Sequence, residues 1–299
     1  MKYRIKTPKI KSFFLFNFAL WSCAMGLADN TLSTEFINLD SVVVDNQGNE
    51  TVLSHQSNIF DSLDSASESY RGVLNDGVAT EEDIFDEVQG TDERKRIFDT
   101  TSYPNRTIGR LELGCTGTLV GPRMVVTAAH CVYNLEKKAW NQNLSFSPGQ
   151  NGDVKPYGTV KWVRAIANKA YTEQKKTEWD IAVVILEKPI GNQVGWMAYA
   201  YDDSISSMSI NINGYPGDKP KGTMWHSFCP TKSVSTDLFT YLCDTYKGNS
   251  GSAIYRFLSQ NNERKIFGIH TNGFDGFNRG TRITKAKFDK LQAWKAENP

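Results

Sequence analysis

A serine in a glycine-rich turn is the residue whose surroundings point most directly to chemistry. The run 243–252 reads Cys-Asp-Thr-Tyr-Lys-Gly-Asn-Ser-Gly-Ser, with Ser250 between Asn249 and Gly251. A serine hydroxyl is a weak nucleophile until a base removes its proton and fixed donors receive the resulting oxyanion. Gly248 lets the backbone turn so that the N–H groups of Gly248 and Ser250 converge, and Gly251 leaves the approach to Oγ uncrowded. The motif also fits an ordinary loop, so it needs partners elsewhere in the chain.

Two stretches upstream supply those partners. His130 stands in Thr-Ala-Ala-His-Cys after a short apolar run, and Asp180 stands directly before the apolar run 181–186. Histidine, aspartate and serine in this order, each beside a hydrophobic strand pattern, resemble the catalytic triad of chymotrypsin-type proteases. We therefore predict His130 as the general acid and base, Asp180 as the residue that orients it, and Ser250 as the nucleophile. The N–H groups of Gly248 and Ser250 would form the oxyanion hole.

The elements that must hold these side chains read as an all-β domain. Short β-branched and aromatic runs, separated by turn signals such as Pro-Gly and Asn-Gly, predict strands at 107–113, 117–120, 124–127, 159–165, 181–186, 208–212, 238–242, 252–255, 266–270 and 281–283. This density of short strands favours a barrel or a sandwich. Near the end of the chain, Phe288, Leu291 and Trp294 form one stripe of a predicted helix over 285–295.

The first 28 residues have the pattern of a signal peptide. Five Lys and Arg precede a short apolar core at 13–21, and cleavage after Ala28 follows from the small residues before it. The core is too short for a membrane span, so we expect a secreted protein without stable membrane association. A lipid attachment at Cys23 is an alternative, for which the neighbouring Trp21 is a poor fit.

Charge divides the rest of the chain into two parts. Residues 29–87 hold fourteen Asp and Glu against the single base Arg71 and show no strong periodicity, whereas residues 88–299 hold 28 Lys and Arg against 19 Asp and Glu. The acidic part could be a disordered tail that keeps a precursor soluble. Given the triad downstream, we favour a propeptide that docks electrostatically on the basic enzyme and inhibits it until it is cleaved.

Cysteine usage fits an oxidising compartment. Once Cys23 has left with the signal peptide, Cys115, Cys131, Cys229 and Cys243 remain as an even set. A bridge between Cys115 and Cys131 would fix the strands that hold His130, but four cysteines permit three pairings. The four histidines of the chain are scattered without metal-ligand spacing, so we expect no metal site.

Several further segments resemble one protease family. They are Cys-Thr-Gly-Thr-Leu at 115–119, Ala-Ala-His-Cys-Val-Tyr at 128–133, Ser-Pro-Gly at 147–149, Pro-Ile-Gly-Asn-Gln-Val-Gly at 189–195, Gly-Tyr-Pro-Gly-Asp-Lys at 214–219, Asp-Thr-Tyr at 244–246, Ile-His-Thr-Asn-Gly at 269–273 and Asn-Arg-Gly-Thr-Arg-Ile-Thr at 278–284. With them, the region 88–299 resembles bacterial glutamyl endopeptidases, the V8-like branch of the chymotrypsin-fold serine proteases, and most of all the Bacillus type. The resemblance implies two antiparallel six-stranded β-barrels with the active site between them.

The same resemblance implies how a substrate glutamate is held. Thr245, His270 and its neighbour Thr271 would line the S1 pocket, together with the free α-amino group of the mature chain. A hydroxyl and a protonated imidazole both donate to a carboxylate. His270 could instead be a buried strand histidine that donates to backbone. The family's mature chains start near Glu87-Val88, so we predict Val88, or a residue close to it, as the mature N-terminus.

Two alternatives stay open on sequence grounds. Asp244 lies six residues before Ser250, where trypsin places the aspartate that binds Arg or Lys, although Bacillus-type enzymes also have an aspartate there. Unlike trypsin, the chain has Asn249 before the nucleophile, and an amide cannot form an ion pair with a new N-terminus at Ile97. A catalytically inactive, protease-like binding protein is the other alternative.

The remaining predictions concern partners and cofactors. We expect a monomer that needs no cofactor and acts on protein or peptide substrates, in particular acidic ones, because a basic surface attracts acidic peptides. The chain shows no nucleic-acid-binding motif.

Overall fold

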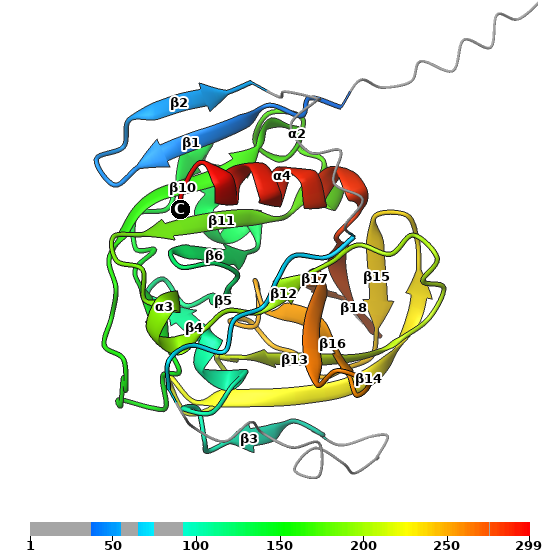
Figure 1. Ribbon diagram of the computed structural model, residues 1–299. Helices are drawn as coiled ribbons and strands as arrows, with labels where there is room; N and C mark the ends of the chain where they lie inside the picture. Colours follow the sequence, from blue (N-terminus) through cyan, green and yellow to red (C-terminus); the bar gives the residue numbers. More distant parts are fainter. Residues whose placement is uncertain (1–36, 55–64, 75–91, 275) are drawn as a thin grey trace, which may run out of the picture. The chain divides into compact units, whose positions relative to one another are not determined.

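The computed structural model describes residues 37–54, 65–74, 92–274 and 276–299, and within these ranges it forms two eight-stranded sheets and one two-stranded sheet (Figure 1). The predicted signal peptide, its Cys23 and the predicted N-terminus Val88 lie outside the described residues.

The first sheet contains the first barrel. Its strands are β1 (Ser41–Asp45), β2 (Glu50–Leu53), β4 (Ile108–Leu111), β5 (Thr116–Leu119), β6 (Met124–Thr127), β9 (Phe146–Pro148), β10 (Trp162–Asn168) and β11 (Ala182–Leu186), in the order β2-β1-β10-β11-β6-β5-β4-β9. A bridge between Phe146 and Val160 joins β9 to the residues before β10. The six strands from β9 round to β10 therefore close on themselves, and β1 and β2 extend the sheet beyond the barrel.

The second sheet contains the second barrel. Its strands are β3 (Lys95–Ile97), β12 (Ala198–Tyr199), β13 (Ser209–Gly214), β14 (Met224–Val234), β15 (Leu238–Tyr241), β16 (Ala253–Leu258), β17 (Glu263–Phe274) and β18 (Phe277–Arg282). The order β17-β16-β13-β14-β15-β18 is closed by a further pairing of β17 with β18. A closed barrel leaves no exposed edge among these six strands.

The remaining elements are short, apart from the last helix. They are η2 (Asn105–Thr107), α1 (Ala129–Val132), β7 (Tyr133–Asn134), β8 (Ala139–Trp140), α2 (Lys169–Thr172), η3 (Thr177–Trp179), α3 (Gly191–Val194) and α4 (Lys285–Ala296). The predicted stripe of α4 is confirmed, since Phe288, Leu291 and Trp294 are all buried. The ring of Phe288 packs against Tyr199 and Tyr201 with centroid distances of 5.4 and 5.3 Å. Among the described residues, no helix is long and apolar enough to cross a membrane.

Alternating apolar side chains account for the barrel interiors. Along β6 and β11, Val125 and Val184 point into one core cluster and Val126 and Val183 into another, because neighbouring strand residues face opposite sides. Both faces of these strands are buried, which explains why their sequences read as continuous apolar runs. Of these two strands, β6 ends shortly before His130 and β11 begins shortly after Asp180.

The all-β prediction with a C-terminal helix is confirmed, and all ten predicted strands overlap an observed one. The structure also contains two strands that the sequence did not predict. The acidic region 29–87 shows no strong periodicity in sequence, yet β1 and β2 form a hairpin there, and β1 pairs with β10 from Ser41–Asn168 to Asp45–Arg164. Val42, Val43 and Val44 are buried on both faces of the sheet, so burial as well as charge holds this region.

Replacing Phe288 with Ala tests the packing of α4. The cavity left between Tyr199 and Tyr201 should lower the free energy of unfolding by about 3–5 kcal/mol. Urea denaturation measures the change, in an S250A background that prevents self-digestion. Val154 is 65 % exposed, so V154A should stay within about 0.5 kcal/mol. An equal loss in both variants would contradict the packing described here.

Candidate active site

His130 is positioned by the end of β6 and by Asp180, which stands just before β11. It lies in the single turn α1, directly after β6, while Asp180 stands between η3 and β11. Because β6 and β11 pair antiparallel, with Thr127 opposite Ala182, the end of β6 and the start of β11 lie side by side. The pairing therefore places the histidine and the aspartate together, although they are fifty positions apart.

The carboxylate of Asp180 binds His130 through both oxygens. Oδ2 lies 2.8 Å from Nδ1 of the ring, and Oδ1 accepts the backbone N–H of His130 at 2.9 Å. The Asp180 side chain is 5 % exposed and that of His130 is 32 % exposed. The two contacts fix the ring, leave Nε2 for a reactant, and keep the carboxylate away from water.

Two opposing effects act on the pKa of His130. Burial disfavours the imidazolium, whereas the charge of Asp180 and its hydrogen bond favour it, and the net result is a pKa above the usual value for histidine. A raised pKa suits a base that must first accept a proton and then hold it beside a carboxylate.

Ser250 comes from the second barrel and is tied directly to the first. Its carbonyl accepts the N–H of Thr116 on β5 at 2.9 Å, and Cys131, the neighbour of His130, lies 3.7 Å from the same oxygen. The hydroxyl makes no hydrogen bond to His130 among the described residues. Catalytic hydrogen bonds of this kind often tighten only when substrate binds.

The two glycines of the serine loop have different roles. Gly248 has φ +107°, which confirms the turn predicted at that position. Gly251 is required for another reason than the one predicted: a Cβ there would lie 2.1 Å from Thr127 Oγ1 and 2.2 Å from Thr116 O. It lets the serine loop approach the backbone of the first barrel.

Two backbone N–H groups beside Ser250 are available. Neither Gly248 N–H nor Ser250 N–H donates to an acceptor in the described part of the chain, whereas the carbonyls on either side are engaged. Gly248 O accepts from Thr116 Oγ1 at 2.8 Å, and Lys247 O accepts from Gly217 N at 2.7 Å. Held in this way, the loop leaves both N–H groups without a described acceptor, as the predicted oxyanion hole requires.

His270 is buried next to the serine loop. Its backbone forms two hydrogen bonds of 2.9 Å with that loop, from Gly251 N to His270 O and from His270 N to Ser252 O. On the ring, Nδ1 lies 2.6 Å from the hydroxyl of Tyr241, so its partner is a side chain and not the backbone. Burial, helped by nearby His130, lowers the pKa of His270 to about 3. The ring is therefore neutral near pH 7, where residue type alone suggested a protonated one.

The two threonines predicted in the pocket differ. Thr245 is half buried, and its hydroxyl makes no hydrogen bond to any described residue, so it can serve a ligand. Thr271 is buried, and its hydroxyl donates to Arg279 O at 3.2 Å across an irregularity in the pairing of β17 and β18. Thr271 therefore contributes to the sheet.

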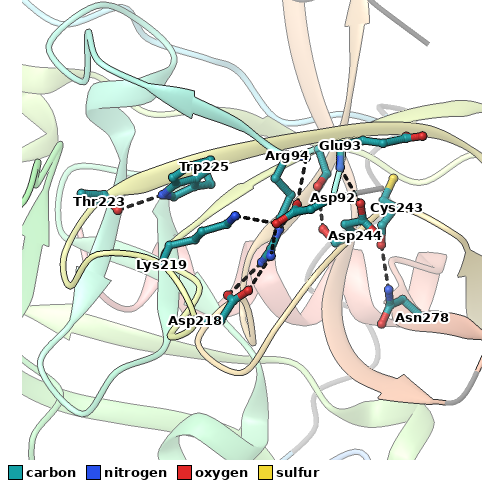
Figure 2. Close-up of polar contacts among 11 residues, drawn as sticks. Asp92, Glu93, Arg94, Asp218, Lys219, Thr223, Trp225, Cys243, Asp244 and Asn278 are labelled. Atoms are coloured by element: carbon teal, nitrogen blue, oxygen red, sulfur yellow. Dashed lines mark hydrogen bonds and ion pairs between the residues drawn. The ribbon is translucent and has the colours of Figure 1, made fainter. Parts of the chain in front are cut away.

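Asp244 is engaged by the segment that precedes β3. Its Oδ2 accepts the backbone N–H of Glu93 at 2.8 Å, and its carbonyl accepts from Ser227 Oγ at 2.6 Å. Figure 2 shows the carboxylate turned toward Glu93. Sequence reasoning missed this contact, because nothing in the residue pattern places residue 93 near residue 244.

The segment at 92–94 is also tied to a neighbouring loop by charge. Arg94 bridges Asp92 and Asp218, and Lys219 adds a second cation beside Asp92 (Figure 2). The hydrogen bonds and charge of Arg94 hold the pKa of Asp218 below its usual range. The loop carrying Asp218 in turn contacts the serine loop through the bond from Gly217 N to Lys247 O.

Both pairs of cysteines form disulfides at the edge of the site. Cys115 is bonded to Cys131, and Cys229 to Cys243. The first pair joins the residue before β5 to the neighbour of His130, and the second joins β14 to the start of the serine loop. In the described residues the one group with metal-binding potential is Cys115, Cys131 and His130, and its two sulfurs are consumed by the disulfide.

Comparison with known proteins agrees with this geometry. The trypsin family profile matches residues 98–295. A Bacillus licheniformis protein named glutamyl endopeptidase is 38 % identical over 218 residues, 70 % of this chain and 69 % of that protein. A Bacillus subtilis protein named extracellular metalloprotease is 41 % identical over 216 residues, 69 % of this chain and 68 % of that protein. A solved structure of a Glu endopeptidase in complex with MPD, 30 % identical, matches with a TM-score of 0.64 and covers 69 % of this chain and 98 % of its own.

The chain therefore belongs to the trypsin family, and it is a serine endopeptidase of the chymotrypsin fold. The similarities in sequence and in structure place it in the V8-like branch, together with the glutamyl endopeptidases.

The pH dependence of hydrolysis tests the role of His130. Because the base must be neutral to accept a proton, kcat/KM should rise with pH through a midpoint above 6.5. Replacing Asp180 with Asn should lower kcat by about 10⁴-fold. Asp203 is exposed, and D203N should leave rate and profile unchanged. A rate that falls as the pH rises from 6 to 8 would contradict this role.

Proposed function

We propose that this enzyme is made as a secreted zymogen and, once mature, cleaves peptide bonds after glutamate through an acyl-enzyme on Ser250. The observation that carries the catalytic part is the pairing of His130 with Asp180 on the first barrel, beside a serine loop tied to that barrel by the bond from Thr116 N to Ser250 O.

The reaction follows from these positions. Ser250 Oγ attacks the peptide carbonyl carbon while His130 Nε2 takes its proton, and the N–H groups of Gly248 and Ser250 stabilise the oxyanion. The C–N bond then breaks as His130 returns the proton to the leaving amine. Water repeats the sequence on the acyl-enzyme, and Asp180 stabilises the imidazolium in both halves.

A preference for glutamate rests on His270 and Thr245. A Tyr241 phenol that donates to Nδ1 leaves the proton of a neutral ring on Nε2, the tautomer that donates to a carboxylate. Burial raises the pKa of Tyr241 well above its usual value, which keeps the phenol protonated. A neutral ring can donate a hydrogen bond to a glutamate carboxylate, and it does not repel cationic groups elsewhere in the substrate. Once bound, the negative carboxylate would raise the pKa of His270. Thr245 adds a hydroxyl with no other described partner.

The trypsin-like alternative is disfavoured by the state of Asp244. Its carboxylate already accepts the N–H of Glu93, so binding a substrate arginine would compete with that contact. The inactive alternative is tested by covalent labelling, because a fluorophosphonate reacts with a serine only when a base and an oxyanion hole activate it. If the mature protein is labelled and the label is lost in S250A and H130A, the protein is an active enzyme. If the mature protein is not labelled, the inactive binding protein is supported instead.

The name of the B. subtilis relative suggests a metal, but the described residues do not fit a metal site. The one candidate cluster among them is Cys115, Cys131 and His130. It offers His130 as a single metal ligand, since the two cysteine sulfurs are bonded to each other. A catalytic zinc site needs about three protein ligands. The proposed mechanism therefore assigns no step to a metal.

Maturation upstream of Asp92 fits the contacts of the N-terminal segment. Asp92, Glu93 and Arg94 are anchored beside the serine loop, and four further residues span at most about 14 Å when extended. An N-terminus at Val88 would thus stay near the pocket. Ile97 lies in β3, where it pairs with Met224 of β14, and a paired strand is a poor protease substrate. Inhibition by the acidic propeptide, predicted for residues 29–87, remains a proposal.

A peptide library digested with activated enzyme tests the specificity. Cuts should follow glutamate, and H270Q should lower kcat/KM for glutamyl peptides by about 10- to 100-fold, the value of a hydrogen bond to a charged group. The neighbouring exposed Tyr246 provides a control, since Y246F should change it less than about two-fold. Cuts after arginine or lysine that disappear in D244N would establish the trypsin-like alternative instead.

The N-terminal residue of the purified mature enzyme tests the activation site. Mass spectrometry should find Val88 or a residue within a few positions of it, and E87Q should slow maturation because a glutamate-specific enzyme cuts after Glu87. Active enzyme that begins at Ile97 would contradict the proposal.

A further inference from the structure

The described part of the acidic region, residues 37–54 and 65–74, is bound to the rest of the enzyme by strand pairing and by buried side chains. We call it the N-terminal clamp. Its first piece is the hairpin of β1 and β2, which lies beside β10 and α4 at one end of the first sheet (Figure 1). Its second piece runs along β12 and the residues just before it.

The hairpin supplies buried apolar side chains to the first barrel. Val44 is fully buried in the cluster that contains Leu119 and Val184, and Val43 joins the cluster that contains Ile166 and Trp294. Ser41 is also fully buried, and its hydroxyl accepts Trp294 Nε1 at 3.0 Å. Side chains this deep in two clusters belong to the core.

The hairpin also satisfies the edge of the first sheet. Beyond the paired residues, Lys169 N donates to Asp40 O at 2.8 Å, Asn168 Nδ2 donates to Leu39 O at 2.9 Å, and Asn46 N donates to Val163 O at 3.0 Å. Without the hairpin, β10 would expose a row of unpaired backbone groups beside apolar side chains.

The second piece binds the connection between the two barrels. Ser67 N donates to Tyr199 O at 2.8 Å, Tyr70 and Trp196 exchange two backbone hydrogen bonds of 3.0 and 2.7 Å, and their rings lie 4.7 Å apart. The buried guanidinium of Arg106 donates to Arg71 O at 2.6 Å. Removing this piece would leave a buried cation without one of its acceptors, which is costly.

Charge adds to these contacts on α4. Burial lowers the pKa of Lys290 and of Lys295, and the charges of Asp40 and Glu68 oppose this lowering in part. The acidic composition of the clamp thus reduces the cost of burying two cations. Electrostatic docking was expected of this region, and here it supplements strand pairing.

The described part of the clamp forms no hydrogen bond or ion pair with His130, Asp180 or the serine loop. It contacts β10, α2, α3, α4, η2, β12, the connection before β12 and Asn262, and the His130 side chain stays 32 % exposed with the clamp in place. A segment bound through a barrel edge, away from the nucleophile, can persist without blocking substrate.

We propose that the N-terminal clamp stays bound after maturation as a non-covalent subunit of the enzyme, extending the first sheet beyond its barrel and binding the connection to the second barrel. The proposal rests on the proposed maturation cut between the clamp and Asp92. Two pieces joined by one short linker reinforce each other, because binding of one keeps the other at high local concentration.

The test uses the full chain with S250A, in which residues 81–87 are replaced by the recognition sequence of an unrelated site-specific protease. After complete cleavage, checked on a denaturing gel, size-exclusion chromatography and native mass spectrometry should find clamp and body together in a 1:1 complex that separates only in denaturant. Separate elution at micromolar concentration would overturn the proposal. Because the cut is made by an added protease, the outcome does not depend on the enzyme's own activity.

A pair of valine variants shows whether the described contacts hold the complex. V44A removes methyl groups that are fully buried and should raise the dissociation rate by about 10-fold. Val52 on β2 is 51 % exposed, so V52A should change the rate less than about two-fold. Equal effects would show that the clamp is held elsewhere and would contradict the assignment.

Fluorophosphonate labelling separates a subunit from an inhibitor. With Ser250 present, the cleaved complex should label while the clamp is bound, and the rate should not rise after the clamp is washed away in mild denaturant and the body is returned to buffer. Labelling that begins only after removal would make the clamp an inhibitor and overturn the proposal. Absence of labelling in both states would contradict the proposed function, and the co-elution result would still decide the fate of the clamp.

Discussion

The candidate site depends on one close approach between the two barrels. The serine loop of the second barrel rests on β5 through the bond from Thr116 N to Ser250 O, and Gly251 permits it because any Cβ there would collide with the backbone of Thr116. The same first barrel holds His130 at the end of β6. Backbone contacts therefore hold the serine loop against the barrel that carries His130, and such contacts are stiffer than side-chain contacts alone.

The polar contacts around the serine loop would set the proposed substrate pocket apart from that of trypsin. The chain has an aspartate at the trypsin position, yet its carboxylate holds the backbone of Glu93. The residue facing the proposed substrate carboxylate is a neutral, buried His270 whose orientation Tyr241 fixes. A pocket that presents uncharged donors discriminates by hydrogen bonding, and such sites reject a ligand that leaves a buried donor unpaired.

Local patterns were enough to predict much of this arrangement. The pairing of His130 with Asp180 was predictable because each stands beside a strongly apolar strand, and α4 because its stripe has a helical period. The eleven-residue β14 was not predicted, since Lys, Pro, Ser and His interrupt its apolar residues. The hairpin of β1 and β2 was missed because three valines among acidic residues are too few to indicate a strand. They form one by pairing with β10, which lies more than a hundred positions away. The neutral state of His270 likewise follows from burial, which no short pattern contains.

The two disulfides also link the enzyme to the redox state of its surroundings. One tether ends at the neighbour of His130 and the other seven residues before Ser250, so each half of the site has its own covalent brace. In a reducing compartment both braces would be absent, and each loop would be held by its hydrogen bonds alone. Oxidation of the thiols would therefore stiffen both halves of the candidate site at the same time.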